Sequence, residues 1–257
     1  MITGKEYVKD LVKRGIRDDG RDFSEFRQPL KVEYGISGKA AEGSAQVTIG
    51  DTVVIAGVKL ETGTPYPDTP DEGTLMVNVE LTPLSSPEYE SGPPVIDAIE
   101  LARVVDRGIR ESHSLNFGKL CIEAEKKMWI VCVDIYTINA AGNLFDACAL
   151  AALAALKDAR FPAFDGEKID YRTRTETPLP LERLPVACTV WRVSGKLLVD
   201  PTRDEELASD ARLTVAFDDD GNICAMQKGG NSPVSEQEVD SIVDISSQKA
   251  GMLREVL

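Results

Sequence analysis

The spacing of apolar residues in the first 81 positions predicts one short helix followed by paired strands. Apolar side chains three and four positions apart predict an amphipathic helix that ends at Gly15, and these side chains are Val8, Leu11 and Val12. From Pro29 onward the apolar positions recur every second residue, as is typical of half-buried strands. We therefore expect a hairpin around the turn at Gly50-Asp51 and a further strand over residues 75–81.

The middle of the chain predicts two helices that flank one central strand. A helix is expected to begin near Val95 and to include residues 96–112, because acidic residues come early and arginines late, as the helix dipole favours. Residues 129–138 are almost continuously apolar, which is typical of a central strand. A turn at Gly142-Asn143 then leads into an alanine-rich helix over residues 145–157, whose small side chains would let it lie close to the sheet.

The last hundred residues predict a loop and a second strand-rich region. Residues 161–185 are polar and rich in proline, threonine and arginine, so we expect a linker or long loop there. Strand-like segments follow at residues 186–193, 196–200, 211–218 and 223–227. A hairpin turn is expected at Asp220-Gly221, and the capping box Ser235 to Glu238 predicts the start of a final helix.

Together these elements predict an α+β fold with two strand-rich halves, mixed sheets and flanking helices. We expect an N-terminal helix and arm over residues 1–27 and a first half over residues 28–162. A linker over residues 163–184 would then connect to a second half over residues 185–257.

Composition and charge narrow the functional classes. The 257 residues are 42% hydrophobic and 28% charged, a mixture that can bury a full core. A formal net charge of −14 opposes non-specific attraction to nucleic acid, so any site for a polyanion has to be a local basic patch. Because the sequence has neither a signal-peptide pattern nor a long apolar run, we expect a cytoplasmic protein that does not contact a membrane.

Histidine and cysteine usage argues against several common active sites. His113 is the only histidine, which excludes a histidine-based triad or a multi-histidine metal site, and we expect it at the surface or in an ion pair. The acidic run Asp218–Asn222 lacks the downstream acid of a calcium loop, so a hairpin turn is expected instead. We expect neither a metal nor a cofactor. The cysteines stand singly and are predicted to be buried, reduced thiols: Cys121, Cys132, Cys148, Cys188 and Cys224.

Three arginines lie on one face of the helix predicted over residues 96–112. Arg103, Arg107 and Arg110 are separated by four and three positions, so their side chains point in the same direction. Helical ion pairs, Glu100 with Arg103 and Asp106 with Arg110, explain the same spacing without any ligand. The spacing alone favours ion pairs over a binding site for phosphate groups.

Four stretches of the chain resemble, in order and spacing, the RNase PH-type proteins, which are phosphorolytic 3′→5′ exoribonucleases and their ring-forming relatives. They are residues 15–21 (Gly-Ile-Arg-Asp-Asp-Gly-Arg), 43–54, 78–81 (Asn-Val-Glu-Leu) and 100–110. Within this family, further stretches resemble the non-catalytic ring subunit of the archaeal exosome, and they are residues 98–107, 142–148 and 199–206.

The resemblance implies an RNase PH-type fold and a silent subunit of an RNA-degrading assembly. Such a subunit alternates with a homologous catalytic subunit in a hexameric ring of three heterodimers, capped by RNA-binding subunits, which threads single-stranded RNA for 3′→5′ phosphorolysis. Relatives use residues that match Arg103 and Arg107 to hold RNA phosphates, so we hypothesise that these two arginines bind RNA, with Arg110 as a further candidate.

The resemblance also implies that no catalytic residue is present. Active relatives bind phosphate with a Gly-Thr-Arg-Ser-like turn before the alanine-rich helix. Residues 142–146 contain no arginine there and end in Asp146, a carboxylate that would face and repel the anion. Active relatives also carry two aspartates six residues apart in the second half. Alignment on Val199-Asp200 places Glu206 and Arg212 at these positions.

A shift of this alignment by two residues would pair Asp204 with Asp210 and restore the spacing of an active relative. We prefer the first alignment because it keeps the following strand, residues 213–217, in register with that of the relatives. Two alternatives stay open: an active phosphorolytic exoribonuclease that uses Asp204 and Asp210, and a purely structural ring subunit that does not contact RNA.

Overall fold

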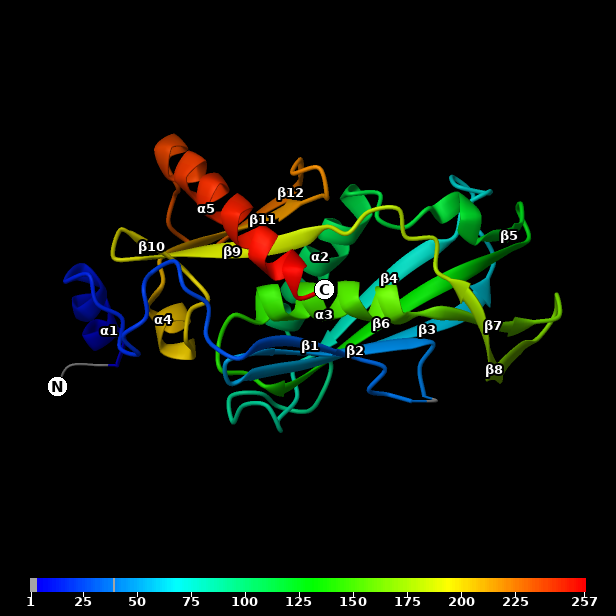
Figure 1. Ribbon diagram of the computed structural model, residues 1–257, viewed down its shortest axis with the longest axis horizontal. Coiled ribbons are helices and arrows are strands. Elements are labelled where there is room, and N and C mark those ends of the chain that lie inside the picture. The colour runs from blue at the N-terminus through cyan, green and yellow to red at the C-terminus, as the bar shows by residue number, and fades with distance from the viewer. Residues whose placement is uncertain (1–3, 39) are drawn as a thin grey trace.

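The chain forms two main sheets with helices between and outside them (Figure 1), and the computed structural model describes residues 4–38 and 40–257. The first three residues of the predicted N-terminal arm lie outside the described residues. The first sheet has the order β1-β2-β3-β6-β4, with the short β5 paired to β6. Its strands are β1 (Leu30–Tyr34), β2 (Gly43–Ile49), β3 (Thr52–Gly63), β4 (Thr74–Glu80), β5 (Cys121–Glu123) and β6 (Lys127–Asn139).

The central position predicted for residues 129–138 is confirmed. Strand β6 lies between β3 and β4, antiparallel to the first and parallel to the second, so this sheet is mixed. The predicted hairpin around Gly50-Asp51 is also confirmed, with β2 and β3 paired in antiparallel register from Gly43 and Val58 to Ile49 and Thr52. A short 3-10 helix, Phe117–Leu120, precedes β5.

Two helices pack between the sheets, and the alanine-rich one lies closest to the strands. They are α2 (Ile96–Glu111) and α3 (Leu144–Asp158), which contact each other and both sheets. A Cβ atom at Gly43 would lie 2.4 Å from the carbonyl oxygen of Ala155, so only glycine allows β2 to approach α3 this closely. The prediction that small side chains bring this helix against the sheet is confirmed.

The second sheet is antiparallel throughout and has the order β10-β9-β11-β12. Its strands are β9 (Val186–Val193), β10 (Lys196–Val199), β11 (Ala211–Phe217) and β12 (Ile223–Gly229). Helix α5 (Glu236–Glu255) covers β9 and β11, and the capping box of Ser235 and Glu238 begins it as predicted. The Asp218–Asn222 turn is confirmed as well, because Asp218 Oδ1 accepts from the backbone N–H of Asn222 at 2.8 Å.

The N-terminal helix α1 (Gly4–Lys13) packs against the second half of the chain. Its buried residues Val8 and Val12 join a small apolar cluster with Trp191, Val193, Leu198 and Ala208. Helix α1 lies beside α4 (Arg203–Ala208) at one end of the molecule (Figure 1). The domain boundaries at residues 27, 162 and 184 stay predictions.

Three expectations about local structure are wrong. The segment predicted to be a loop contains a hairpin, β7 (Arg160–Phe164) and β8 (Ile169–Pro178), which the apolar pattern did not reveal because β8 has no buried residue. Residues 203–208, for which no helix was expected between two predicted strands, form α4 behind a capping box of Thr202 and Glu205. Of the five cysteines, Cys148 and Cys188 are buried and the other three are half-buried. Cys121 lies on the peripheral β5, Cys132 on the more open face of β6 and Cys224 on the edge strand β12.

Candidate functional site

The outer face of α2 presents two exposed arginines that have few contacts within the chain. Arg103 is exposed and forms no ion pair or hydrogen bond with any described residue, and Arg107 has only Glu111 at 4.0 Å. Both line a hollow of about 200 Å³ together with Val77, Ala102 and Asp106. The expected ion pair between Glu100 and Arg103 is not formed, because Glu100 Oε1 lies 2.6 Å from Arg212 Nη2.

Arg110 differs from these two arginines although it lies on the same helix. Its guanidinium donates to both carboxylate oxygens of Asp106 at 2.9 and 3.1 Å, as the helical spacing predicts, and to the carbonyl oxygen of Leu75 at 2.8 Å. The group also stacks 5.5 Å from the ring centroid of Phe117. Arg110 therefore joins α2 to β4, and its donors are largely engaged.

A pocket of about 190 Å³ lies at the N-terminus of α3, between the two halves. Asn143 precedes the helix in a left-handed conformation, with φ 56° and ψ 42°. Its backbone N–H donates to Glu206 Oε1 at 2.8 Å, and Arg203 Nη1 donates to Glu206 Oε2 at 3.2 Å. Burial raises the pKa of Glu206 above its ordinary value, although these donors and the nearby Arg27 oppose the shift.

Arg212 lines the same pocket from β11. Its guanidinium carbon lies 3.8 Å from the ring centroid of Phe145 and 5.7 Å from that of Trp191. The other side of the group covers Gly229, where a Cβ atom would lie 2.4 Å from the guanidinium carbon. Arg212 is thus held between an aromatic ring and a glycine, and it is paired with Glu100.

The structure therefore brings together the two residues of the first alignment, Glu206 and Arg212, in one pocket. Asp204 is exposed on α4 and does not line this pocket. Asp210 is engaged elsewhere, with Lys9 Nζ at 3.3 Å and the backbone N–H of Ser194 at 3.1 Å.

Asp146, the carboxylate expected to face a bound anion, points into the protein instead. It is fully buried, and its Oδ1 accepts from the backbone N–H of Thr189 at 2.8 Å. Its Oδ2 accepts from Asn143 Nδ2 at 3.1 Å, and the same amide nitrogen donates to Asp200 Oδ1 at 3.0 Å. Burial raises the pKa of Asp146 to about 7.

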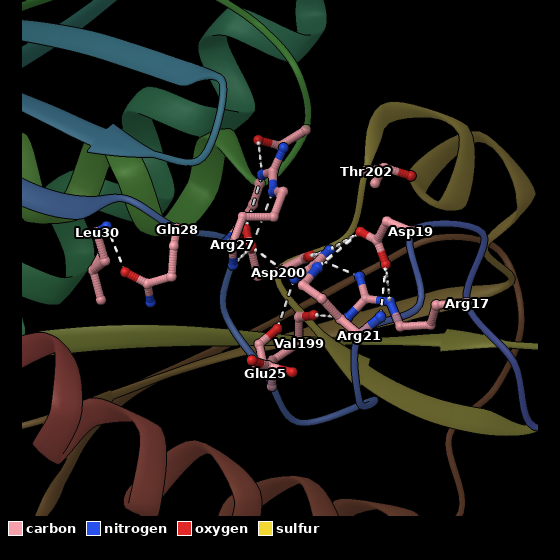
Figure 2. A network of polar contacts seen from close by, with 12 residues as sticks. Arg17, Asp19, Arg21, Glu25, Arg27, Gln28, Leu30, Val199, Asp200 and Thr202 are labelled. Atoms are coloured by element: carbon pink, nitrogen blue, oxygen red, sulfur yellow. Dashed lines mark hydrogen bonds and ion pairs between the residues drawn. The ribbon is translucent and has the colours of Figure 1, made fainter.

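A network of arginines and acids connects the N-terminal arm to this turn (Figure 2). Arg27 donates to both oxygens of the buried Asp200 and to the carbonyl oxygens of Ala141 at 2.7 Å and Gly142 at 3.1 Å. Arg21 Nη1 lies 3.0 Å from Asp200 Oδ2. The turn before α3 is therefore fixed by the arm and by the end of β10.

Arg17 is the most buried cation of this network. Its Nε and Nη2 donate to the two carboxylate oxygens of Glu205 at 2.8 and 2.6 Å, and both side chains are at most 2% exposed. In the sequence, residues 15–21 carried only the family resemblance, and this contact was not predicted because the two partners are 188 positions apart.

The structure also bears on His113, on metal ligands and on membrane-spanning helices. His113 is exposed, as predicted. Among the residues that the structure describes, no group of three or more His, Cys, Asp or Glu side chains could hold a metal ion. Within the same described ranges, no helix combines the length and the apolar character needed to cross a bilayer.

Comparison with known proteins identifies the family. Residues 25–162 match the model for domain 1 of the 3′ exoribonuclease family, and residues 183–249 match the model for domain 2. The chain is 45% identical over 250 residues to the exosome complex component Rrp42 of Methanosarcina acetivorans, covering 97% of this chain and 91% of the relative. It is 48% identical over 254 residues to Rrp42 of Archaeoglobus fulgidus, covering 98% of this chain and 94% of the relative.

Solved structures agree with these matches. A chain from the Archaeoglobus fulgidus exosome with RNA bound to the active site aligns with a TM-score of 0.90 at 47% identity, covering 98% of this chain and 96% of that chain. A chain from an archaeal exosome core aligns with a TM-score of 0.85 at 44% identity, covering 98% and 95%. The predicted RNase PH-type fold is confirmed. The two family models and the whole-length relatives show that the chain belongs to the 3′ exoribonuclease (RNase PH) family.

Proposed function

We propose that this chain is a non-catalytic ring subunit of an archaeal exosome that contacts RNA phosphates through Arg103 and Arg107. It alternates with a homologous catalytic subunit in a hexameric ring of three heterodimers, with RNA-binding subunits as caps. Relatives named exosome complex component Rrp42 match over nearly the whole chain, which supports this assignment. The observation that carries it is the pocket at α3, where Glu206 and Arg212 replace a pair of acids.

Internal pairing in this pocket supports catalytic silence. Phosphorolysis requires basic groups and N–H donors that are free to hold the attacking phosphate. Here Arg212 is paired with Glu100, and Arg203 is paired with Glu88 and Glu206. Glu206 also accepts the backbone N–H of Asn143. The donors of the pocket are therefore largely neutralised by the chain's own carboxylates.

The two exposed arginines of α2, Arg103 and Arg107, support a contact with RNA. A guanidinium is permanently charged and matches the geometry of phosphate oxygens, so two of them beside one hollow can hold an RNA backbone without reading its sequence. Arg103 and Arg107 meet this description, whereas Arg110 contributes mainly by joining α2 to Leu75 and Asp106. The chain thereby helps to position RNA for the neighbouring catalytic subunit.

Replacing Arg103 and Arg107 together with alanine is expected to weaken RNA binding by the assembled ring about 10- to 30-fold, on the order of 1.4–2 kcal/mol. The slope of log K against log salt concentration should decrease by about 1.4, because two contacts to single-stranded RNA each contribute about 0.7. Fluorescence anisotropy with labelled single-stranded RNA at several salt concentrations measures both quantities.

The matched control is Lys13→Ala with Arg14→Ala, which removes two exposed cations, the last residue of α1 and the residue after it. This control should leave the affinity and the salt slope close to those of the unaltered ring. If the Arg103 and Arg107 substitutions also leave both values unchanged, the chain is a structural ring subunit without RNA contact.

A further inference from the structure

The N-terminus of α3 is bound by a carboxylate from a distant part of the chain. Glu206, on α4, accepts the backbone N–H of Asn143 at 2.8 Å although the two residues are 63 positions apart. We propose that the Glu206 carboxyl group occupies an anion site at the start of α3 and so excludes inorganic phosphate from this chain. The α3 anion site comprises the N-terminal backbone N–H groups of α3 and the guanidinium groups of Arg203 and Arg212.

The first element of this site is the helix itself. The opening N–H groups of an α-helix have no carbonyl acceptor inside the helix, and its dipole favours a negative charge there. Helix α3 is 15 residues long, and the side chain of its N-cap residue, Asn143, makes no capping hydrogen bond. That side chain donates to Asp146 and Asp200 instead. Asp146, in the first turn of α3, accepts from Thr189 and from the Asn143 side chain, so the carboxylate that accepts the Asn143 backbone N–H is that of Glu206.

The second element is an unpartnered buried cation. The side chain of Arg212 is 6% exposed, and its Nη1 has no hydrogen-bond partner in the part of the chain that the structure describes. Arg212 lines the same pocket as Glu206 and the first residues of α3, Leu144 and Phe145. A buried N–H donor without an acceptor is unfavourable, so an anion that reached Nη1 would be stabilised by it.

The surrounding charges explain why phosphate cannot enter beside Glu206. Glu100 is paired with Arg212, Glu88 is paired with Arg203, and Asp97 also lines the pocket. With Glu206 present, a further anion would meet like charges and find the Asn143 N–H already engaged. Removal of Glu206 frees this N–H and Arg203 Nη1, and it makes the pocket more positive by one charge.

The test measures binding of inorganic phosphate to the full chain by isothermal titration calorimetry and by 31P line broadening. Glu206→Ala is expected to bind phosphate with a Kd on the order of 1–10 mM. The unaltered chain should show no saturable binding in this range. Asp204→Ala is the matched control, because it removes an exposed acid from the same helix without opening the site, and it should behave like the unaltered chain.

The proposal is overturned if a folded Glu206→Ala chain does not bind phosphate, if the unaltered chain binds it equally well, or if Asp204→Ala gains the same affinity. Circular dichroism checks the fold, and Glu206→Ser replaces the alanine variant if that one does not fold. The biological meaning of excluding phosphate rests on the proposed function as a non-catalytic subunit. The measured binding of phosphate does not depend on that proposal. Phosphorolysis by the unaltered chain would refute the silence, whereas the anion site is decided by binding alone.

Discussion

Replacing Arg17 with alanine is expected to lower the free energy of unfolding by about 3–5 kcal/mol, because it leaves the carboxylate of Glu205 buried without its counter-charge. Glu205 is 2% exposed, and Arg17 donates to both of its carboxylate oxygens. Arg17 also donates to the carbonyl oxygens of Val199 at 3.1 Å and Asp200 at 2.8 Å. Its loss would therefore weaken the attachment of the N-terminal arm to the end of β10, where Arg21 and Arg27 still bind Asp200.

Urea-induced unfolding of the purified chain measures this effect. Arg14→Ala is the matched control. Arg14 directly follows α1, and its ion pair with Asp10 is exposed, so a change within about 1 kcal/mol is expected. If Arg17→Ala lowers the free energy of unfolding by no more than Arg14→Ala does, the buried pair of Arg17 and Glu205 does not hold the arm in place.

The stability of the chain is expected to decrease as the pH rises from about 4 to 7, with Asp146 as a main cause. Its folded-state pKa is raised to about 7 from an ordinary value of 3.8. Within this window the folded chain retains a proton that the unfolded chain releases, so folding is favoured at the acidic end and loses this advantage as the pH rises. A shift of this size corresponds to a loss on the order of 4 kcal/mol.

Asp146→Asn should flatten this pH dependence because the amide does not titrate. Its oxygen can still accept the N–H of Thr189, but its N–H₂ group would face Asn143 Nδ2, which donates to Asp146 Oδ2 in the unaltered chain. The Asn143 amide then has to turn its Oδ1, which has no partner among residues 4–38 and 40–257, toward the new N–H₂ group. Urea unfolding at several pH values between 4 and 8 compares this variant with the unaltered chain and with Asp165→Asn, an exposed control. If the free energy of unfolding changes with pH in the same way for Asp146→Asn and the unaltered chain, Asp146 is not the cause of the pH dependence.

Most of the fold could be predicted because the apolar pattern of each element matches its burial. Strand β3 alternates between buried and half-buried residues, and β6 has a run long enough to fill the centre of a mixed sheet. Strand β8 could not be found in this way, since neither of its faces is buried. Helix α4 is short, but its Thr202 and Glu205 capping box was a signal in the sequence that would have revealed it.

The candidate site was predictable where helical spacing or the resemblance to the family determines it. The spacing on α2 placed Arg103 and Arg107 on one face, and the resemblance to active relatives singled out Glu206 and Arg212. Long-range partners were not predictable from helical spacing. Glu100 pairs with Arg212 and not with Arg103, and Arg17 pairs with Glu205 across most of the chain.

Catalytic silence is the central claim, and a phosphorolysis assay on the purified full chain tests it most directly. The chain is incubated with single-stranded RNA, inorganic phosphate and magnesium, and nucleoside diphosphates are quantified. Because Glu206 and Arg212 occupy the pocket at α3, we expect no release above that of a sample without protein. Phosphate-dependent release that is lost on replacing Asp204 or Asp210 would contradict the account and establish the chain as an active exoribonuclease.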